Sequence, residues 1–316
     1  MRAQFFIKFL IISGSLFSGF SAFADASSEA SASTVTLNSI AQNLKLDDLN
    51  LKAVQVSDQM TTTDDRETHQ IQLVHSEVGT IQITLNGPKN FTTSSAKYSV
   101  LFVTAGFMEP TKILQALQNK NLIVVSYTYP ASREDFAKDP SLVTKTVRII
   151  PGQIALALEW LKARKYVDSD RLSVLGLSLG SLFTPVALQL ASLRSITPAA
   201  TIFAYSSDNL NQTMQKILSK NIQEPTLTMV YQLMSGITNT YDPKTFLPGL
   251  RGPFLAIYGM DDQLIPKADS LEQYTLLPNQ KNIVWLDGTH ISNDQPELIK
   301  KMAQKILEFL SQSNLL

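Results

Sequence analysis

Short uninterrupted apolar runs alternate along the chain with stretches of helical periodicity. The runs are Val100–Thr104, Leu122–Tyr127, Leu172–Leu175, Ala200–Ala204, Phe254–Tyr258 and Ile283–Leu286. Strands that are buried on both faces have this composition, so the runs predict a parallel sheet. Between and after the runs, apolar residues share one helix face at Ile154, Leu158 and Leu161, and again at Ile299, Met302, Ile306 and Phe309 after Pro296. The alternation predicts an α/β fold with right-handed crossovers and helices on both faces of the sheet.

Two regions depart from this rhythm. Residues 69–74 and 81–85 alternate apolar and polar side chains around Gly79, which predicts an antiparallel hairpin before the parallel strands. Residues 208–248 carry apolar residues at helical spacing between two predicted strands. We interpret this region as a small helical cap, inserted into a single domain that covers residues 37–316.

The N-terminus has the pattern of an export signal. Arg2 and Lys8 precede an apolar stretch, and Ala22-Phe23-Ala24 supplies a small-x-small cleavage site. We predict that residues 1–24 are a signal peptide cleaved after Ala24, and that residues 25–36 form a flexible polar tether. The protein would then be periplasmic or secreted. A retained membrane anchor is the alternative, although the apolar stretch is short for a membrane span.

Composition narrows the possible chemistry. The chain of 316 residues has 27 basic and 27 acidic side chains, so it lacks the basic excess of a nucleic-acid-binding protein. It has no cysteine, which excludes disulfides, thiolate metal ligands and a cysteine nucleophile. Its three histidines would all be needed for a three-histidine metal centre. We therefore expect no metal, no cofactor and no nucleic-acid partner.

A candidate nucleophile lies in Gly176-Leu177-Ser178-Leu179-Gly180, between an apolar run and a predicted helix. This is the strand–turn–helix context of a G-x-S-x-G nucleophile elbow, which exposes the serine hydroxyl at the start of a helix. Side chains at 176 or 180 would collide with the neighbouring strand and helix, so glycine is expected at both positions. The same residues would also suit an ordinary tight turn.

A serine nucleophile needs a base and an acid that orients the base. His290 is the one histidine that follows Ser178, and it comes just after the last apolar run, whereas His69 and His75 belong to the early hairpin. Asp261 and Asp262 follow the preceding run, and either could be the acid. The order serine, acid, histidine is typical of hydrolases built on a parallel sheet. Asp208, one strand earlier, is a further candidate.

The developing oxyanion needs backbone donors from the residue after the nucleophile and from the loop after an earlier strand. Leu179 supplies the first position, and Phe107 in the loop Thr104-Ala105-Gly106-Phe107-Met108 supplies the second. Gly106 would let the backbone approach the substrate closely. A simple strand-to-helix turn is the alternative interpretation of that loop.

Together these residues resemble the α/β-hydrolase superfamily over about residues 69–314. Gly259-x-x-Asp262-x-x-Ile265-Pro266 is similar to the family's acid motif, which favours Asp262 over Asp261, and Gly288-Thr289-His290 is similar to its Gly-x-His segment. The lead-in Asp168-Ser169-Asp170-Arg171-Leu172 resembles the dienelactone-hydrolase, prolyl-oligopeptidase and acyl-thioesterase branches. The sequence departs from the family pattern at Ala105, where histidine is common, at Ser181, and at Pro185, which we expect to bend or shorten the helix after Ser178.

The resemblance and the residues together predict an exported serine hydrolase that cleaves a carboxylic ester or thioester. Ser178, Asp262 and His290 would form the catalytic triad, with the N–H groups of Phe107 and Leu179 as the oxyanion hole. A serine peptidase is one alternative. A binding protein that has the same fold without catalysis is another, from a different class of function.

Overall fold

The structure, a computed structural model, describes residues 37–105, 108–132, 135, 141–208, 240–278 and 281–316. The predicted signal peptide and tether lie outside these residues. So does most of the predicted cap, residues 209–239. Among the described residues, no helix is both long enough and apolar enough to cross a membrane.

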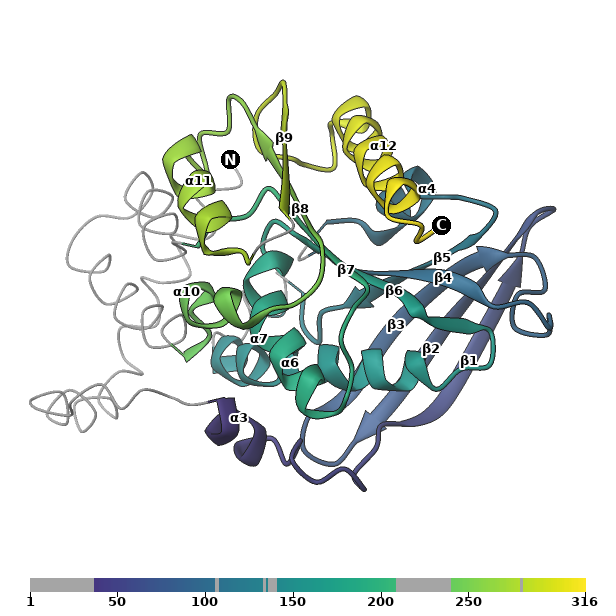
Figure 1. Ribbon diagram of the computed structural model, residues 1–316. Helices are drawn as coiled ribbons and strands as arrows, with labels where there is room; N and C mark the ends of the chain where they lie inside the picture. Colours follow the sequence, from purple (N-terminus) through teal and green to yellow (C-terminus); the bar gives the residue numbers. More distant parts are fainter. Residues whose placement is uncertain (1–36, 106–107, 133–134, 136–140, 209–239, 279–280) are drawn as a thin grey trace, which may run out of the picture.

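The described residues build one twisted sheet of nine strands in the order β1-β2-β3-β5-β4-β6-β7-β8-β9 (Figure 1). The strands are β1 (Val54–Thr62), β2 (Arg66–His75), β3 (Gly79–Pro88), β4 (Tyr98–Thr104), β5 (Leu122–Thr128), β6 (Val167–Leu177), β7 (Ala200–Ala204), β8 (Phe254–Gly259) and β9 (Lys281–Leu286). All six predicted apolar runs are strands, and β5, β4, β6, β7, β8 and β9 pair in parallel, as expected.

The remaining strands pair antiparallel. The predicted hairpin is β2 and β3, and β3 joins the parallel strands through β5. β1 was not predicted from the sequence; it adds to the outer edge of β2. Its side chains are exposed along nearly the whole strand, and Asp58 interrupts the alternation of Val54, Val56 and Met60 that could have revealed it.

Helices cover both faces of the sheet (Figure 1). They are α3 (Leu37–Asn43), α4 (Pro110–Ala116), α6 (Ser141–Lys162), α7 (Gly180–Leu193), α10 (Pro243–Phe246), α11 (Lys267–Leu276) and α12 (Pro296–Gln312), with a 3-10 turn at Leu247–Gly249. Buried residues of α3, α6 and α7 pack into one hydrophobic cluster. Those of α4 and α12 pack into a second. The layers therefore have the predicted α/β arrangement.

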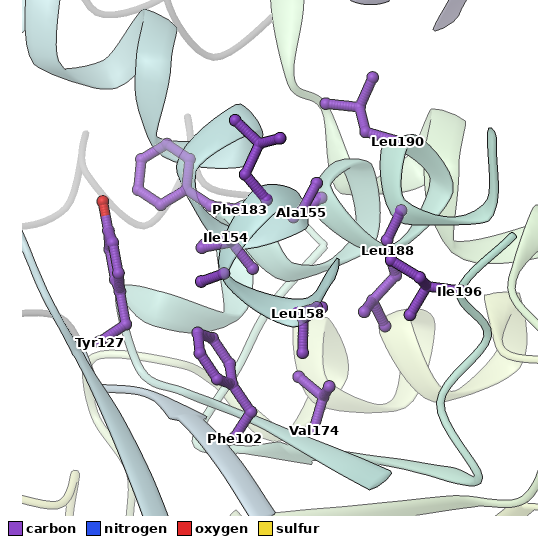
Figure 2. Packing of buried hydrophobic residues seen from close by; sticks show 14 of the residues in the cluster. Phe102, Tyr127, Ile154, Ala155, Leu158, Val174, Phe183, Leu188, Leu190 and Ile196 are labelled. Atoms are coloured by element: carbon purple, nitrogen blue, oxygen red, sulfur yellow. The ribbon is translucent and has the colours of Figure 1, made fainter. Parts of the chain in front are cut away.

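Successive side chains of the central strands enter the two clusters in turn. On β4, Val100 and Phe102 belong to the α6–α7 side, whereas Leu101 and Val103 belong to the α4–α12 side. Figure 2 shows Phe102 beneath Ile154 and Leu158 of α6, two of the residues predicted to line that helix face. Burial on both faces explains why the strands form continuous apolar runs in the sequence.

Of the two expected effects of Pro185 on the helix after Ser178, the shortening does not occur. α7 runs without a break from Gly180 to Leu193 with Pro185 inside it, so the proline does not shorten it. The residues of α7 are buried continuously from Gly180 to Leu188. Packing on all sides offsets the one backbone hydrogen bond that proline cannot donate.

Candidate active site

Ser178 lies in a strained turn between β6 and α7. Its φ of 50° is in the left-handed region that few non-glycine residues adopt. A Cβ at Gly180 would lie 1.8 Å from the backbone oxygen of Thr104, and one at Gly176 would lie 2.7 Å from Oγ1 of Thr184. As predicted, glycine is therefore required at both positions. The neighbouring strand β4 leaves no room for a side chain at 180, and the helix α7 leaves none at 176. The turn is a nucleophile elbow in its geometry.

Three side chains predicted from the sequence meet at the carboxyl edge of the parallel strands. Oγ of Ser178 lies 2.8 Å from Nε2 of His290, and Nδ1 of His290 lies 2.8 Å from Oδ2 of Asp262. With its proton on Nδ1, His290 donates to the carboxylate and accepts from the serine hydroxyl. The His290 side chain is 17% exposed and that of Asp262 only 2%, so the acid is closed to water while the base can reach a substrate.

Asp262 is fixed by the turn that carries it. Its second oxygen, Oδ1, accepts hydrogen bonds from the N–H groups of Leu264 and Ile265, both at 2.9 Å. The carboxylate is thus held by the backbone on one side and by His290 on the other. Asp261 is exposed, which agrees with the motif alignment that favours Asp262.

Asp208, the third candidate acid, faces a different partner. Its side chain is fully buried, and Oδ2 lies 3.3 Å from Nζ of Lys244. Lys244 also contacts Glu272 at 2.7 Å. Burial raises the pKa of Asp208, the Lys244 ammonium opposes the shift, and the Glu272 charge adds to it. Asp208 therefore belongs to an ion-pair group beside the site and does not orient His290.

The loops that carry the acid and the histidine are packed backbone to backbone. The N–H of Asp261 donates to the oxygen of Gly288 at 3.0 Å, and that of Met260 donates to the oxygen of Leu286 at 2.8 Å. A Cβ at Gly259 would lie 2.9 Å from the Gly288 oxygen. Glycine at the head of the acid motif thus allows the two loops to touch, which sets the spacing between Asp262 and His290.

The predicted oxyanion donors are only partly within the described residues. Leu179 is the N-cap of α7, with helical φ and ψ of −53° and −32°. Its N–H donates no hydrogen bond to any other described residue, so it is available at the helix terminus next to Ser178. Phe107 lies outside the described residues, as does Gly106.

The two early histidines have structural partners. Nδ1 of His69 lies 2.8 Å from an oxygen of Asp58, and its Nε2 bonds Glu67. His75 accepts from the N–H of Glu77 at 3.2 Å, and burial lowers its pKa. Both are buried on the same face as Ile71, as the alternation predicted. Neither takes part in the Ser178 site.

One residue of the site was missed by sequence reasoning. Tyr205 directly follows β7, is fully buried, and has its ring centroid 5.7 Å from that of His290. The signal was its place after the run Ala200–Ala204, at the strand edge where site residues gather. An aromatic residue beside an apolar run is more often core, so the pattern alone gave it no role.

No group of three or more histidine, aspartate or glutamate side chains placed to hold a metal ion occurs among the residues with described coordinates. The arrangement at the carboxyl edge is instead that of a serine–histidine–aspartate set on a parallel sheet. The sheet order and the placement of these three side chains are those of the α/β-hydrolase fold.

Comparison with known proteins agrees with this fold. The family model for the alpha/beta hydrolase fold matches residues 152–296. An acetyl xylan esterase from Paenibacillus sp. R4 superposes with a TM-score of 0.62 at 14% identity, covering 89% of this chain and 97% of that one. Acetyl xylan esterase 1 from Thermoanaerobacterium sp. JW/SL YS485 superposes with a TM-score of 0.58 at 15% identity, covering 85% of this chain and 92% of that one. A cold-adapted esterase from an Arctic intertidal metagenomic library superposes with a TM-score of 0.53 at 11% identity, covering 79% of this chain and 99% of that one.

A search of curated proteins finds no significant sequence match. The family match spans the elbow, the acid turn and the histidine loop, and the structural likeness extends over most of the chain. The chain has the α/β-hydrolase fold.

Proposed function

We propose that the protein is an exported serine hydrolase that cleaves a carboxylic ester or thioester through an acyl-enzyme on Ser178. The observation that carries the proposal is the unbroken hydrogen-bonded series from Ser178 through His290 to Asp262, with 2.8 Å at each step. A nucleophile, a base and an orienting acid within hydrogen-bond reach are what acyl transfer requires. Residues 1–24 would direct export.

Each group has a defined role in the proposed reaction. Ser178 Oγ attacks the carbonyl carbon while its proton passes to Nε2 of His290. The tetrahedral oxyanion is held by the N–H groups of Leu179 and Phe107. His290 then gives the proton to the leaving oxygen or sulfur as the bond to the carbonyl carbon breaks. Water attacks the acyl-enzyme by the same steps, which releases the acid and restores Ser178.

Asp262 supports this cycle from one side of the imidazole. Its buried carboxylate keeps the proton on Nδ1 and stabilises the imidazolium that forms when Nε2 takes the serine proton. Because the backbone already holds Oδ1, the carboxylate cannot rotate away when the charge on His290 changes. No step of this chemistry needs a cofactor or metal.

A panel of p-nitrophenyl esters of graded acyl length, together with acyl-CoA thioesters and peptides, tests the proposal. Two of the similar structures are named acetyl xylan esterases, so acetyl esters belong at the short end of the panel. We expect hydrolysis of at least one ester or thioester. Ser178→Ala should lower kcat by about 10⁴- to 10⁶-fold with the same unfolding midpoint, because triad members act as a unit.

Ser181→Ala is the matched control, since this hydroxyl donates to the backbone oxygen of Ser178 and is not aimed at His290. It should keep most of the activity. Near-normal turnover by Ser178→Ala would contradict the proposal. Cleavage of peptides alone would replace the esterase assignment by a peptidase, and no turnover of any acyl substrate would favour a binding protein.

A further inference from the structure

Tyr205 occupies the point between the strands that carry the nucleophile and the acid. It follows Ala204, the last residue of β7, and β7 lies between β6 and β8 in the sheet. The N–H of Ser178 donates to the oxygen of Ala204 at 2.9 Å, and the N–H of Tyr205 donates to the oxygen of Ile257 at 2.7 Å. The backbone at the end of β7 is thus hydrogen-bonded to Ser178 on one side and to Ile257 of β8 on the other.

The backbone of Tyr205 is strained in the same way as that of the nucleophile. Its φ is 51°, against 50° for Ser178. A bulky aromatic residue in the left-handed region is an outlier that persists only where its surroundings impose it, and such outliers gather at functional sites. The strained turn places the side chain at the carboxyl edge of the sheet, beside the triad.

The hydroxyl of Tyr205 is not what the site uses. It is buried and makes no hydrogen bond to the described residues. Burial raises the pKa of Tyr205, and the charge of Asp262 raises it further, so the phenol stays neutral. A neutral hydroxyl without a partner among the described residues holds no other group there and does not titrate near neutral pH, which leaves the ring as the functional part.

The ring touches the base and the turn that carries the acid. Its plane stands at 81° to the imidazole of His290, with the centroids 5.7 Å apart, which is a favourable edge-on aromatic geometry. On another side, a Cβ at Gly259 would lie 3.1 Å from Cε1 of Tyr205. Glycine at the head of the acid motif therefore makes room for this ring as well as for the histidine loop.

We propose that Tyr205 is a positioning residue whose ring braces the imidazole of His290 in line with Ser178 and Asp262 and keeps water from the hydrogen bond between His290 and Asp262. His290 comes from a loop, and its hydrogen bonds to Ser178 and Asp262 fix two points of the ring. The edge-on contact with the Tyr205 ring supplies a third point and limits tilting of the imidazole. The inference rests on the proposed serine hydrolase, because a base must be aligned only if it acts as one.

The histidine count makes a direct test possible. With ring-labelled histidine, NMR shows only His69, His75 and His290, and His290→Gln assigns the third signal. In the wild-type protein we expect a nuclear Overhauser contact between the rings of Tyr205 and His290, and a downfield Nδ1 proton from the bond to Asp262. Tyr205→Leu should weaken or remove that downfield proton and lower kcat on the order of 10²-fold, with KM little changed.

Three further variants distinguish the contribution of the Tyr205 ring from that of its hydroxyl and from effects on folding. Tyr205→Phe keeps the ring and should keep the downfield proton and the activity. Phe254→Leu removes a fully buried ring from the opposite end of the neighbouring strand, so it should lower stability and leave the His290 signals unchanged. If Tyr205→Leu does not fold, Tyr205→Asn replaces it, because asparagine tolerates the left-handed backbone.

Loss of the downfield proton or of activity in Tyr205→Phe would overturn the inference, since the hydroxyl would then be the working part. An absent ring-to-ring contact in the wild type, or an unchanged His290 in Tyr205→Leu, would also overturn it. Failure of the proposed function has a different signature: the NMR results would stand, while Ser178→Ala would hydrolyse esters like the parent protein.

Discussion

At the scale of single residues, the site depends on a few sterically restricted backbone positions. Ser178 and Tyr205 share a left-handed φ at the ends of adjacent strands. Such strain costs on the order of 1–3 kcal/mol per residue and must be offset by the packing around it. Here the close contacts of Gly176 and Gly180 and the bonds at Ala204 hold the turn in place.

The two adjacent aspartates of the acid turn should respond very differently to substitution. Asp262→Asn would let the amide favour the wrong tautomer of His290, so kcat should fall about 10⁴-fold. Asp261→Asn alters an exposed side chain, so its kcat should stay near that of the parent protein. Steady-state kinetics on one ester checks both. Equal and mild effects at the two positions would show that the acid has been misassigned.

The three residues that meet at the site were predictable because each carries a local signal: the glycines around Ser178, the motif around Asp262, and the position of His290 past the last strand. Their spacing was not predictable, because it depends on the contact of Gly259 with Gly288 and on strand order. Tyr205 was missed since its role depends on a backbone angle, which sequence patterns do not report.

At the scale of elements, burial decided what the sequence could reveal. The parallel strands are buried along most of their length, apart from the partly buried edge strand β9, and all were predicted, whereas the exposed β1 was not. β6 begins at Val167, five residues ahead of its apolar run, because the four residues that follow the buried Val167 are polar and partly or fully exposed. The persistence of α7 through Pro185 likewise reflects tertiary packing, which sequence propensity does not contain.

The junction of β4, β6 and α7 is the most sterically restricted element of the site. In Gly180→Ala, the new Cβ would lie 1.8 Å from the backbone oxygen of Thr104, so α7 must shift. We expect a loss of about 3 kcal/mol or more in unfolding free energy, together with a large loss of turnover. Urea unfolding and kinetics on the same sample measure both.

Gly79→Ala provides the comparison for that variant. Gly79 has a φ of 68°, and a Cβ added there would have no heavy atom within 4 Å, so only backbone strain is added, at roughly 1–2 kcal/mol. It lies in the β2–β3 turn and should leave kcat unchanged. If Gly180→Ala were no more harmful than Gly79→Ala, the close approach of α7 to β4 would be wrong.

At the scale of the whole molecule, the two parts of the sheet have different roles. The parallel strands present Ser178, Asp262 and His290 at their carboxyl edge, while the antiparallel strands hold a buried polar network around Glu67. The carboxylate of Glu67 accepts from His69, from the N–H of Asn90 at 2.7 Å and from Thr92 at 3.0 Å. Asp58 contacts the other ring nitrogen of His69 at 2.8 Å. This network ties β1, β2 and the segment after β3 together.

Glu67 should make folding stability depend on pH. Burial alone would raise its pKa, but the hydrogen bonds from His69, Thr92 and Asn90 together lower it. A lowered pKa means that Glu67 stabilises the fold above the unfolded-state value, about 4.3, and that this contribution is lost as pH falls through the folded-state value. Glu67→Gln should therefore cost about 1–3 kcal/mol at neutral pH and progressively less in acid.

Urea unfolding at a series of pH values measures the difference between Glu67→Gln and the parent. Asp47→Asn, an exposed carboxylate, should change the free energy of unfolding by less than about 0.5 kcal/mol throughout. A difference between Glu67→Gln and the parent that does not vary with pH would show that the network stabilises by packing alone.

The proposed chemistry depends above all on Ser178 being an activated nucleophile. Incubation with a fluorophosphonate, followed by peptide mapping in a mass spectrometer, tests this without knowledge of the substrate. We expect one adduct, on the peptide containing Ser178, and slow or absent labelling in His290→Gln, because the hydroxyl then lacks its base. Labelling at another residue, or no labelling of folded wild-type protein, would show that Ser178 is not activated.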